Sequence, residues 1–384
     1  MKEKENYIMW RLEMIKVLYI SDTLKQRFGV TSVIMNYINY FDMKEIKVDL
    51  LVYDDSEPDV IEKLKCKGCN VYFMPKLSIK SVGSFKKIIN NFFENNKYDI
   101  VHSHFNQVDS IIFPIARKNG VKYCISHSHN TKLSDNRIKA IRNRIMCFNI
   151  GKNADYLAAC SEAAGNFLYG KKAFSSDKRL IINNGVDCSK FSFDRNSREE
   201  IRKEFNIDEN SILIGNIGSF KIQKNQSFLI DIFNELSKLD NKYILMLVGD
   251  GEKKSEIIEK VINYGLKDKV IFTGVRKDIP KILSALDAFI LPSLYEGLPV
   301  IGIEAQASGL ECVFSNTITK EVDLTGVIFV DLAEPVSKWA EIISKLSFKH
   351  DESNYNKISK KGYDIKRESK KLESFYKNIM TKNK

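Results

Sequence analysis

The sequence predicts an α/β protein built from two doubly wound parallel sheets that face each other across a cleft. Three observations lead to this prediction. The chain has 384 residues, more than a single domain usually holds. Short runs of apolar and β-branched residues alternate with amphipathic stretches. The polar segment 188–211 interrupts this alternation once, and a fresh series begins after it.

The strand candidates are nearly continuous apolar runs, a pattern typical of parallel strands covered on both faces. Before residue 190 they are expected at 15–21, 47–53, 70–75, 99–104, 122–128, 156–160 and 180–185. After it they are expected at 212–218, 243–249, 269–274, 288–293 and 326–331. Helical periods lie between them, as in 225–239. Ligands of such sheets bind at the carboxyl ends of the strands, so the residues that follow each strand are the functional candidates.

We place the domain boundary at Lys190, which divides the chain into domains 1–190 and 191–365 and a basic C-terminal helix, 366–384. The net charge of +11 belongs to the first domain. Lys and Arg outnumber Asp and Glu by 30 to 20 in residues 1–190, but only by 30 to 29 in residues 191–384. A basic half indicates a polyanionic partner such as nucleic acid, anionic lipid or a phosphorylated substrate.

Composition argues against several classes of protein. The seven cysteines are scattered, and the pair Cys66 and Cys69 lacks the second pair that a zinc ribbon needs. This usage predicts a reducing cytoplasm rather than a disulfide framework. The apolar runs are too short to span a bilayer, and the first residues mix acidic and basic side chains, unlike a secretion signal. We therefore expect a cytoplasmic protein.

The stretch "LPSLYEGLPVIGIE" carries the clearest chemistry. A buried strand runs into a loop, and Pro299 suits the first turn of a helix that Gly309 ends. The free N–H groups near Leu298 and Pro299 then form a phosphate site. Glu296 and Glu304 bracket this site, and each can accept hydrogen bonds from sugar or ribose hydroxyls. The alternative is a capped surface helix with two solvated glutamates.

At this motif the chain resembles the retaining glycosyltransferases of family 4, which have the GT-B fold and the hallmark E-x7-E, here "EGLPVIGIE". The resemblance covers nearly the whole chain and is nearest to the branch that builds capsules and exopolysaccharides. The matching segments occur in family order: "DIVHSHFN", "ISHSHNT", "AACSEAAGNFLYG", "INNGVD", "QKNQSFLIDIF", "LVGDGE", "VIFTGVRKDI" and "LPSLYEGLPVIGIEAQASG". It implies that the last helix crosses back to the first domain.

The resemblance also implies roles for individual residues. Glu304 corresponds to the glutamate that binds ribose, Glu296 to the one that holds the donor sugar, and Lys224 to the lysine that neutralises the donor diphosphate. His127 corresponds to the histidine that contacts the sugar and, with Glu296, completes the expected catalytic pair. The remaining donor-binding candidates are Gly29, Gly218, Lys221, Val275, Arg276, Gly297, Leu298 and Pro299.

Two positions depart from the family pattern. The family usually has Gly-Arg where this chain has Gly218 followed by Ser219, which leaves the diphosphate one cation short unless Lys221 supplies it. The first-domain loop usually carries two glycines, and here it has Phe28 and Gly29. Both departures are expected to affect donor affinity.

The implied reaction moves a hexose from a nucleotide sugar, most simply a UDP-hexose, to a glycan acceptor linked to polyprenyl diphosphate, with retention of configuration. The donor β-phosphate takes the acceptor proton, and the protein stabilises the departing diphosphate. Asp-x-Asp does not occur in the chain, so we expect no metal requirement. Two His-Ser-His copies, His102/His104 and His127/His129, could alternatively hold zinc.

Other functions remain as alternatives. A binding module of the same fold would bind nucleotide sugars without turnover. A nicotinamide-dependent oxidoreductase would need G-x-G-x-x-G after the first strand, where "ISDTLKQRFG" has one glycine. A nucleic-acid-binding protein would explain the basic half but would leave the strand-end chemistry unused, so no nucleic-acid partner is expected.

Residues 137–145, "RIKAIRNRI", predict an amphipathic helix with one apolar stripe, Ile138, Ile141 and Ile145. Its four cations are Arg137, Lys139, Arg142 and Arg144. One interpretation is a solvated surface helix. The other is peripheral attachment to the anionic inner face of the plasma membrane, near a lipid-linked acceptor.

Overall fold

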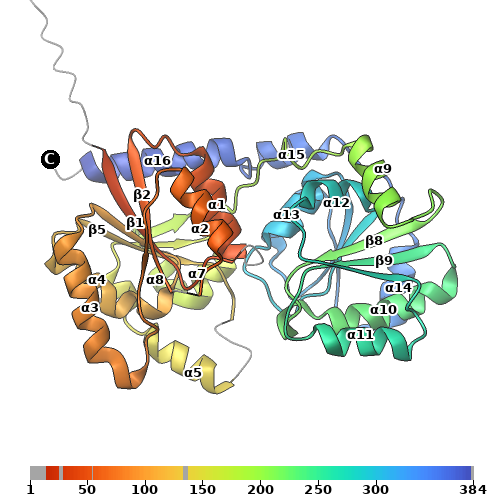
Figure 1. Cartoon of the computed structure of the whole chain (residues 1–384), viewed down its shortest axis with the longest axis horizontal. Coiled ribbons are helices and arrows are strands. Elements are labelled where there is room, and N and C mark those ends of the chain that lie inside the picture. Colours follow the sequence, from red (N-terminus) through yellow and green to blue (C-terminus); the bar gives the residue numbers. More distant parts are fainter. Residues whose placement is uncertain (1–13, 26–28, 54, 133–136, 382–384) are drawn as a thin grey trace, which may run out of the picture.

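Two parallel sheets, each covered by helices on both faces, lie side by side in the computed structural model (Figure 1). The structure describes residues 14–25, 29–53, 55–132 and 137–381. Phe28, one of the two departures noted above, lies outside the described residues. The predicted α/β class with two doubly wound domains is confirmed.

The first sheet has the strand order β3-β2-β1-β4-β5-β6-β7, and its strand pairs are parallel. Its strands are β1 (Ile15–Ile20), β2 (Ile46–Val52), β3 (Val71–Phe73), β4 (Ile100–Ser103), β5 (Tyr123–Ser128), β6 (Tyr156–Ala159) and β7 (Arg179–Ile181). Each of the seven strands overlaps its predicted run, and the first and last residues differ by at most four positions. The order reverses beside β1, which brings the carboxyl ends of β1 and β4 to the switch point where such sheets bind ligands.

The second sheet has the order β10-β9-β8-β11-β12-β13, again parallel. Its strands are β8 (Ile212–Ile217), β9 (Tyr243–Val248), β10 (Val270–Gly274), β11 (Ala288–Leu291), β12 (Glu311–Ser315) and β13 (Ile328–Val330). Strand β12 was not predicted. It is short, begins at a glutamate and contains Cys312 and Ser315, so no long β-branched run marks it.

Helices connect the strands in both domains. Those of the first domain are α1 (Gly29–Tyr40), α2 (Pro58–Cys66), α3 (Val82–Asn95), α4 (Asp109–Lys118), α5 (Arg137–Met146), α6 (Ile150–Asn153), α7 (Glu162–Tyr169) and α8 (Lys171–Phe174). Those that follow are α9 (Arg195–Glu204), α10 (Gln226–Leu239), α11 (Lys254–Asn263), α12 (Ile279–Ala285), α13 (Val300–Ala307), α14 (Val336–Ser344), α15 (Asn354–Lys360) and α16 (Ile365–Thr381). Short 3₁₀ turns occupy 79–81, 106–108, 222–224 and 320–322.

The last helix returns to the first domain, as predicted. Helix α16 lies along the top of that domain in Figure 1, next to α1. The Tyr376 hydroxyl is 3.1 Å from the Tyr19 hydroxyl and 2.6 Å from Nδ1 of His102. The Asp42 N–H donates to the Glu373 carboxylate at 2.5 Å. Residues 365–381 are therefore part of the core of the first domain.

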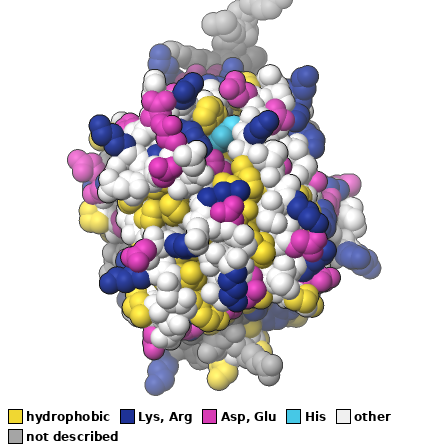
Figure 2. Space-filling model, turned by 90° about the vertical axis from the view of Figure 1, so that its right-hand side faces the viewer, with side chains coloured by type: hydrophobic (Ala, Val, Ile, Leu, Met, Phe, Trp, Pro, Cys, Tyr) yellow, Lys and Arg dark blue, Asp and Glu magenta, His cyan; other side chains and the backbone are white. Residues whose placement is uncertain are grey.

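The apolar core is continuous across the domain boundary. One buried cluster includes Val17 and Ile100 of the first sheet together with Leu298 and Ile303 of the second domain. A second cluster fills the far face of the second sheet around Trp339, which is fully buried. Figure 2 shows the outer end of this domain, where basic and acidic side chains are interspersed, in keeping with the near-neutral charge of residues 191–384.

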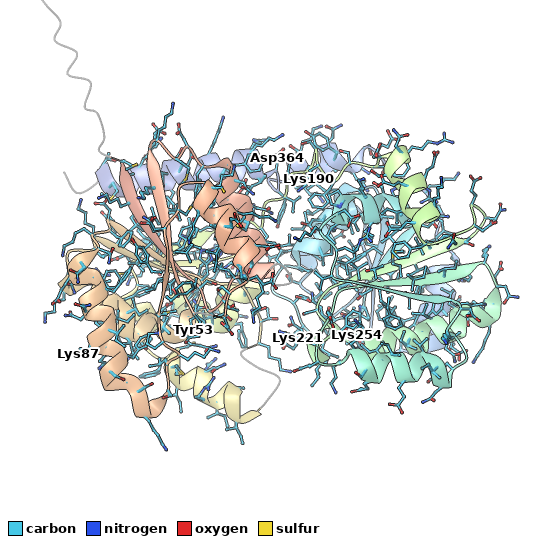
Figure 3. The ribbon with its side chains drawn as sticks, viewed as in Figure 1. Tyr53, Lys87, Lys190, Lys221, Lys254 and Asp364 are labelled. Atoms are coloured by element: carbon cyan, nitrogen blue, oxygen red, sulfur yellow. The ribbon has the colours of Figure 1, made fainter. Side chains whose placement is uncertain are left out.

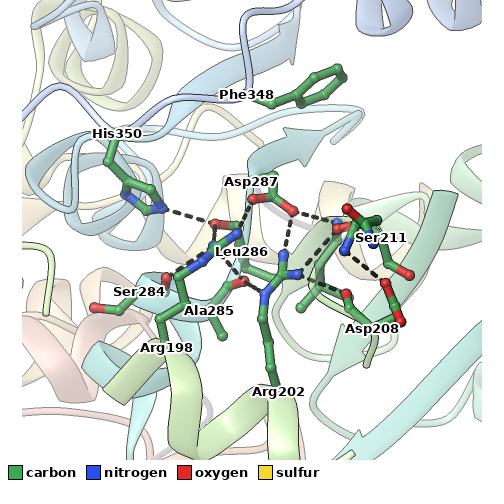
Figure 4. A network of polar contacts seen from close by, with 12 residues as sticks. Arg198, Arg202, Asp208, Ser211, Ser284, Ala285, Leu286, Asp287, Phe348 and His350 are labelled. Carbon is green, nitrogen blue, oxygen red and sulfur yellow. Dashed lines mark hydrogen bonds and ion pairs between the residues drawn. The ribbon is translucent and has the colours of Figure 1, made fainter. Parts of the chain in front are cut away.

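A buried ion-pair network anchors α9 to the start of β11 (Figure 4). Asp287 accepts from Arg202 at 2.5 Å and from Arg198 at 2.6 Å, and it also accepts from the Leu213 N–H at 2.6 Å. Arg202 and Asp287 are 6% and 5% exposed, and the three donors replace the water that this buried carboxylate has lost. The network fixes the base of the strand that leads into the "EGLP" loop. Among the described residues, no helix is both long and apolar enough to span a bilayer.

Candidate active site

A cleft of about 860 Å³ opens between the two domains at the carboxyl ends of both sheets. This volume is within the range of about 300–1,000 Å³ that small-molecule sites occupy. The predicted residues that line it are Gly29, Gly218, Lys221, Lys224, Val275, Arg276, Glu296, Leu298, Pro299 and Glu304. Two predicted residues, Gly297 and His127, do not belong to its described lining.

Glu296 lies on the loop between β11 and α13 and is 7% exposed. Its Oε1 accepts from Lys224 Nζ at 2.6 Å and from the Ser293 hydroxyl at 3.0 Å, and its Oε2 accepts from the Gln223 amide at 3.3 Å. The loop between β8 and α10, which carries Lys224, is thus tied to the "EGLP" loop. Lys224 can turn to a donor phosphate only by sharing its charge with Glu296.

The first domain holds the backbone of the "EGLP" loop from the other side. The side chains of Thr131, Ser161 and Asn184 donate to the carbonyl oxygens of three consecutive loop residues, at 3.2, 2.9 and 2.8 Å. Gly297 is pressed so closely against this domain that a Cβ would lie 2.1 Å from the His129 carbonyl oxygen. Packing between the domains therefore requires a glycine here, while the expected donor contact of Gly297 stays a prediction.

Helix α13 begins at Val300. Pro299 is its N-cap residue, directly before the first turn in which it was predicted to lie. No described side chain caps its first turn, and that turn contains no acidic residue. Leu298, Pro299 and Val300 line the cleft, so the first N–H groups of α13 lie at its wall. Burial raises the pKa of the Glu304 carboxyl to about 7, partly offset by the positive charge of Lys190.

Another wall of the cleft comes from the ends of β8 and β9. A Cβ on Gly249, whose φ is +133°, would lie 2.1 Å from the Gly218 carbonyl oxygen, so the two strand ends touch through glycine backbone. Ser219 follows in the position of the missing arginine and is 8% exposed. Lys221 and Lys190 both line the cleft and lie in different parts of the gap in Figure 3.

The segment after β10 forms a further wall. Val275 is 52% exposed there. Arg276 also lines the cleft, but its guanidinium donates to Glu204 at 2.5 Å and to Asp278 at 2.7 Å. These two acids hold the pKa of Arg276 above its usual range. Arg276 is thus fixed to the second domain, so it shapes the wall rather than reaching across the cleft.

The prediction that His127 contacts the donor sugar does not agree with its position. His127 is 1% exposed, and its Nδ1 lies 3.1 Å from Nε2 of His102. His129 and Asn130 line the cleft in its place. The reason is the length of β5, which continues to Ser128. His127 and His129 share one face of the strand, and His129 is two residues nearer to the cleft.

The four histidines of β4 and β5 form one hydrogen-bonded cluster. Ring nitrogens of His102, His104 and His127 lie within 4.8 Å of one another. Both nitrogens of His102 have partners, Tyr376 and His127, so Nε2 of His104 and Nε2 of His127 are the buried nitrogens without a partner in the described cluster. By distance these three histidines could hold a metal ion, but His102 would then have to give up its hydrogen bond to Tyr376 or to His127. Burial lowers the pKa of all four imidazoles, which are therefore neutral.

Helix α5 presents an apolar stripe to solvent. Ile138, Ile141 and Ile145 are 80%, 64% and 70% exposed, and Phe148 just after the helix extends the stripe at 71%. Arg142 and Arg144 are exposed beside it. The side chains of Arg137 and Lys139, the other two predicted cations, lie outside what the structure describes. The predicted amphipathic helix is present, and its apolar face is uncovered.

Comparisons with known proteins identify relatives of both domains. The family model described as Glycosyltransferase Family 4 matches residues 29–190, and the model described as Glycosyl transferases group 1 matches residues 197–363. The putative glycosyltransferase EpsF of Bacillus subtilis is 31% identical over 335 residues, covering 86% of this chain and 87% of EpsF. An Escherichia coli UDP-Gal:alpha-D-GlcNAc-diphosphoundecaprenol alpha-1,3-galactosyltransferase is 28% identical, covering 64% and 66% of the two chains.

Solved structures share the architecture. Anabaena HepE, crystallised with UDP-glucose, superposes with a TM-score of 0.78 and 17% identity over 95% of this chain and 100% of HepE. WaaG, a glycosyltransferase of lipopolysaccharide biosynthesis, superposes with a TM-score of 0.73 and 14% identity over 94% and 99%. At these identities the likeness concerns the fold, which is that of GT-B proteins.

Proposed function

Because the chain belongs to the glycosyltransferases of family 4 and group 1, we propose that it transfers a hexose from a UDP-hexose to a lipid-linked glycan, with retention of configuration. One observation carries the proposal. Glu296, Glu304, Lys224 and the uncapped start of α13 line a single cleft between the domains. This set supplies acceptors for hydroxyls, a cation for phosphate and backbone donors for the diphosphate.

The donor lies along the second domain in this proposal. Glu304 accepts from the ribose diol, and the base rests on the wall formed by Val275 and Arg276. The diphosphate lies at the first turn of α13, next to Lys224. The proposal draws support from HepE, which was crystallised with UDP-glucose, and from the E. coli relative, whose name specifies UDP-Gal.

The sugar then lies between Glu296 and the first domain. We assign the contact of the first domain to His129 and Asn130, which line the cleft. Glu296 is already bound to Lys224, Gln223 and Ser293, which suits a residue that orients sugar hydroxyls better than a covalent nucleophile. The acceptor hydroxyl attacks the anomeric carbon from the side of the leaving group, passes its proton to the β-phosphate oxygen, and UDP departs.

The departing diphosphate needs cations. Lys224 is one, and Lys221, in the same cleft, is the candidate for the charge that Ser219 lacks. We propose that these groups and α13 stabilise UDP without a divalent ion. EDTA should therefore leave transfer largely intact. Loss of transfer that manganese or zinc restores would contradict the metal-free mechanism and direct attention to the histidine cluster.

The acceptor is proposed to be a glycan on polyprenyl diphosphate, at the cytoplasmic face of the membrane, in capsule or exopolysaccharide synthesis. The name of the E. coli relative, which specifies a diphosphoundecaprenol acceptor, supports this choice. The uncovered stripe of α5 with its flanking cations supports contact with an anionic lipid surface.

The decisive experiment has two stages. Thermal-shift titrations with UDP-, GDP- and ADP-sugars identify the nucleotide, and the preferred sugar is then tested for hydrolysis and for transfer to a lipid-linked glycan. Ser219 favours one competing function, a binding module of the same fold. A protein that binds UDP-sugars but neither hydrolyses nor transfers them would be such a module.

A further inference from the structure

The histidine cluster contains a contact that the proposed function leaves unexplained. Nδ1 of His104 lies 2.8 Å from Nε2 of His129, the imidazole at the cleft wall. His104 follows β4 and His129 follows β5, so the contact joins the carboxyl ends of two neighbouring strands. Two rings confine the ring of His104. Its centroid lies 4.9 Å from that of Tyr19 and 4.7 Å from that of His102, on which it stacks.

The neutral state of both rings restricts which one donates. A neutral imidazole carries one N–H and one acceptor nitrogen. If Nε2 of His129 donated, His104 would be left with its proton on Nε2, which is buried and has no partner. If Nδ1 of His104 donates, the buried Nε2 of His104 is a bare acceptor. Buried N–H groups without a partner are rarer than unpaired acceptors, so the second arrangement is favoured.

The direction of this hydrogen bond decides whether Nδ1 of His129 carries a proton or is a bare acceptor. When Nε2 of His129 accepts, the proton of His129 must reside on Nδ1. His129 lines the cleft, so its Nδ1–H, the ring donor that His104 does not engage, is available to a ligand there. Oxygen atoms are the groups that a hexose and a diphosphate present, and a phosphate oxygen can only accept. A donor at this wall therefore matches the ligand, whereas a bare nitrogen would repel a phosphate oxygen.

We propose that His104 is a positioning residue that donates from Nδ1 to His129 and so presents the Nδ1–H of His129 to an oxygen of the bound nucleotide sugar. The inference rests on the proposed function only in naming the ligand. The same pair explains why a His-Ser-His copy stands at the carboxyl end of each strand, with the first histidine inside the strand and the second just after it. Residues two apart share a face, so the second histidine of each copy lies at the end nearer the cleft. The low pKa of both imidazoles agrees with neutral rings that keep one tautomer across physiological pH.

Two amide substitutions of His104 distinguish the loss of its hydrogen bond to His129 from a change in the size of its side chain. The side-chain amide of asparagine reaches the place of Nδ1, and that of glutamine reaches the place of Nε2. H104N should therefore keep a donor to His129, while H104Q loses it. Turnover of UDP-glucose or UDP-galactose should remain near the wild-type value in H104N. In H104Q, kcat should fall about threefold to tenfold, the worth of one hydrogen bond, with KM for the donor nearly unchanged. Equal activity of the two variants would overturn the proposal.

Nitrogen-15 NMR of histidine side chains tests the tautomer without activity. The chain has only five histidines, so single variants assign their signals. The intact protein should show His129 protonated at Nδ1, bare at Nε2 and unchanged between pH 6 and pH 8. H104Q should shift His129 toward the other tautomer, and H104N should not. A wild-type His129 protonated at Nε2, or a metal-bound signal, would overturn the proposal. If neither UDP-sugar is turned over, the proposed function fails, while this spectrum still decides the tautomer.

Discussion

Glu296 and Glu304 are eight residues apart in the chain, but their surroundings differ. Glu296 already has a lysine partner, whereas the carboxylate of Glu304 accepts no hydrogen bond from the described residues, and burial raises its pKa to about 7. One carboxylate is oriented before a ligand arrives, and the other needs a ligand to supply its donors. This difference suits the assignment of Glu296 to the sugar and Glu304 to the ribose.

The assignment predicts different losses for the two alanine variants. E296A should reduce turnover by orders of magnitude, while UDP still binds, since Lys224 becomes free for the diphosphate. E304A should weaken UDP about tenfold to a hundredfold, the worth of charge-assisted hydrogen bonds. Calorimetric titration with UDP and turnover of the UDP-sugar measure the two effects. An equal loss of UDP affinity in both variants would contradict the division of roles.

The raised pKa of Glu304 predicts a pH dependence of stability. Its ordinary pKa is 4.5, and the folded value is about 7. Between these values the folded protein binds a proton that the unfolded chain has lost, so the free energy of unfolding falls as pH rises through this window. The shift corresponds to at most about 3 kcal/mol, and the partial solvent exposure of the side chain reduces this.

Urea unfolding of the wild type and E304Q at pH 5 and pH 8 measures this effect. Glutamine keeps the shape and does not titrate, so the variant should match the wild type at pH 5 and be more stable at pH 8. A constant difference between the two proteins at both pH values would mean that Glu304 titrates normally.

Helix α5 carries a prediction at the scale of an element. Its four cations contribute about 1 kcal/mol each near an anionic surface, and that attraction is screened over about 8 Å at physiological salt. Changing Arg137, Lys139, Arg142 and Arg144 to Gln should abolish flotation with anionic vesicles, and raising the salt should weaken flotation of the wild type. Transfer to a lipid-linked acceptor should fall, while UDP binding should not.

A matched variant controls for net charge. Lys80, Lys86, Lys87 and Lys118 are exposed on the first domain away from α5, and changing all four to Gln removes the same charge. This protein should float like the wild type. If both quadruple variants float equally well, α5 is only a solvated helix.

The elements were largely predictable, and the misses have physical causes. Apolar runs mark parallel strands buried on both faces, and these were found except β12, whose five residues include Glu311, Cys312 and Ser315. His127 was assigned to the sugar by resemblance, but His129 lines the cleft, because the sequence does not show where β5 ends. Thr131, Ser161 and Asn184 were missed because they bind backbone oxygens of the other domain, and such a contact leaves no pattern in a single sequence.

At the scale of the molecule, the cleft depends on close contact between domains at Gly297. G297A should force the "EGLP" loop away from the His129 carbonyl, because a Cβ would lie 2.1 Å from that oxygen. Turnover should fall more than tenfold, with UDP binding by the second domain retained. G83A is the control, since a Cβ on Gly83 meets nothing within 4 Å. Wild-type turnover in G297A would mean that activity does not require this close contact between the domains.

The return of α16 also has a consequence for synthesis of the protein. Tyr19 and Tyr376 meet although 357 residues separate them in the chain. On the ribosome, the first domain emerges long before α16. Until then, the face of its sheet that α16 covers, at Tyr19 and His102, stays exposed. The second domain needs no such late segment for its sheet, so it can complete folding first. The domain that is synthesised first is then the last to become native. A chaperone that shields apolar surface is therefore needed longest on the first domain.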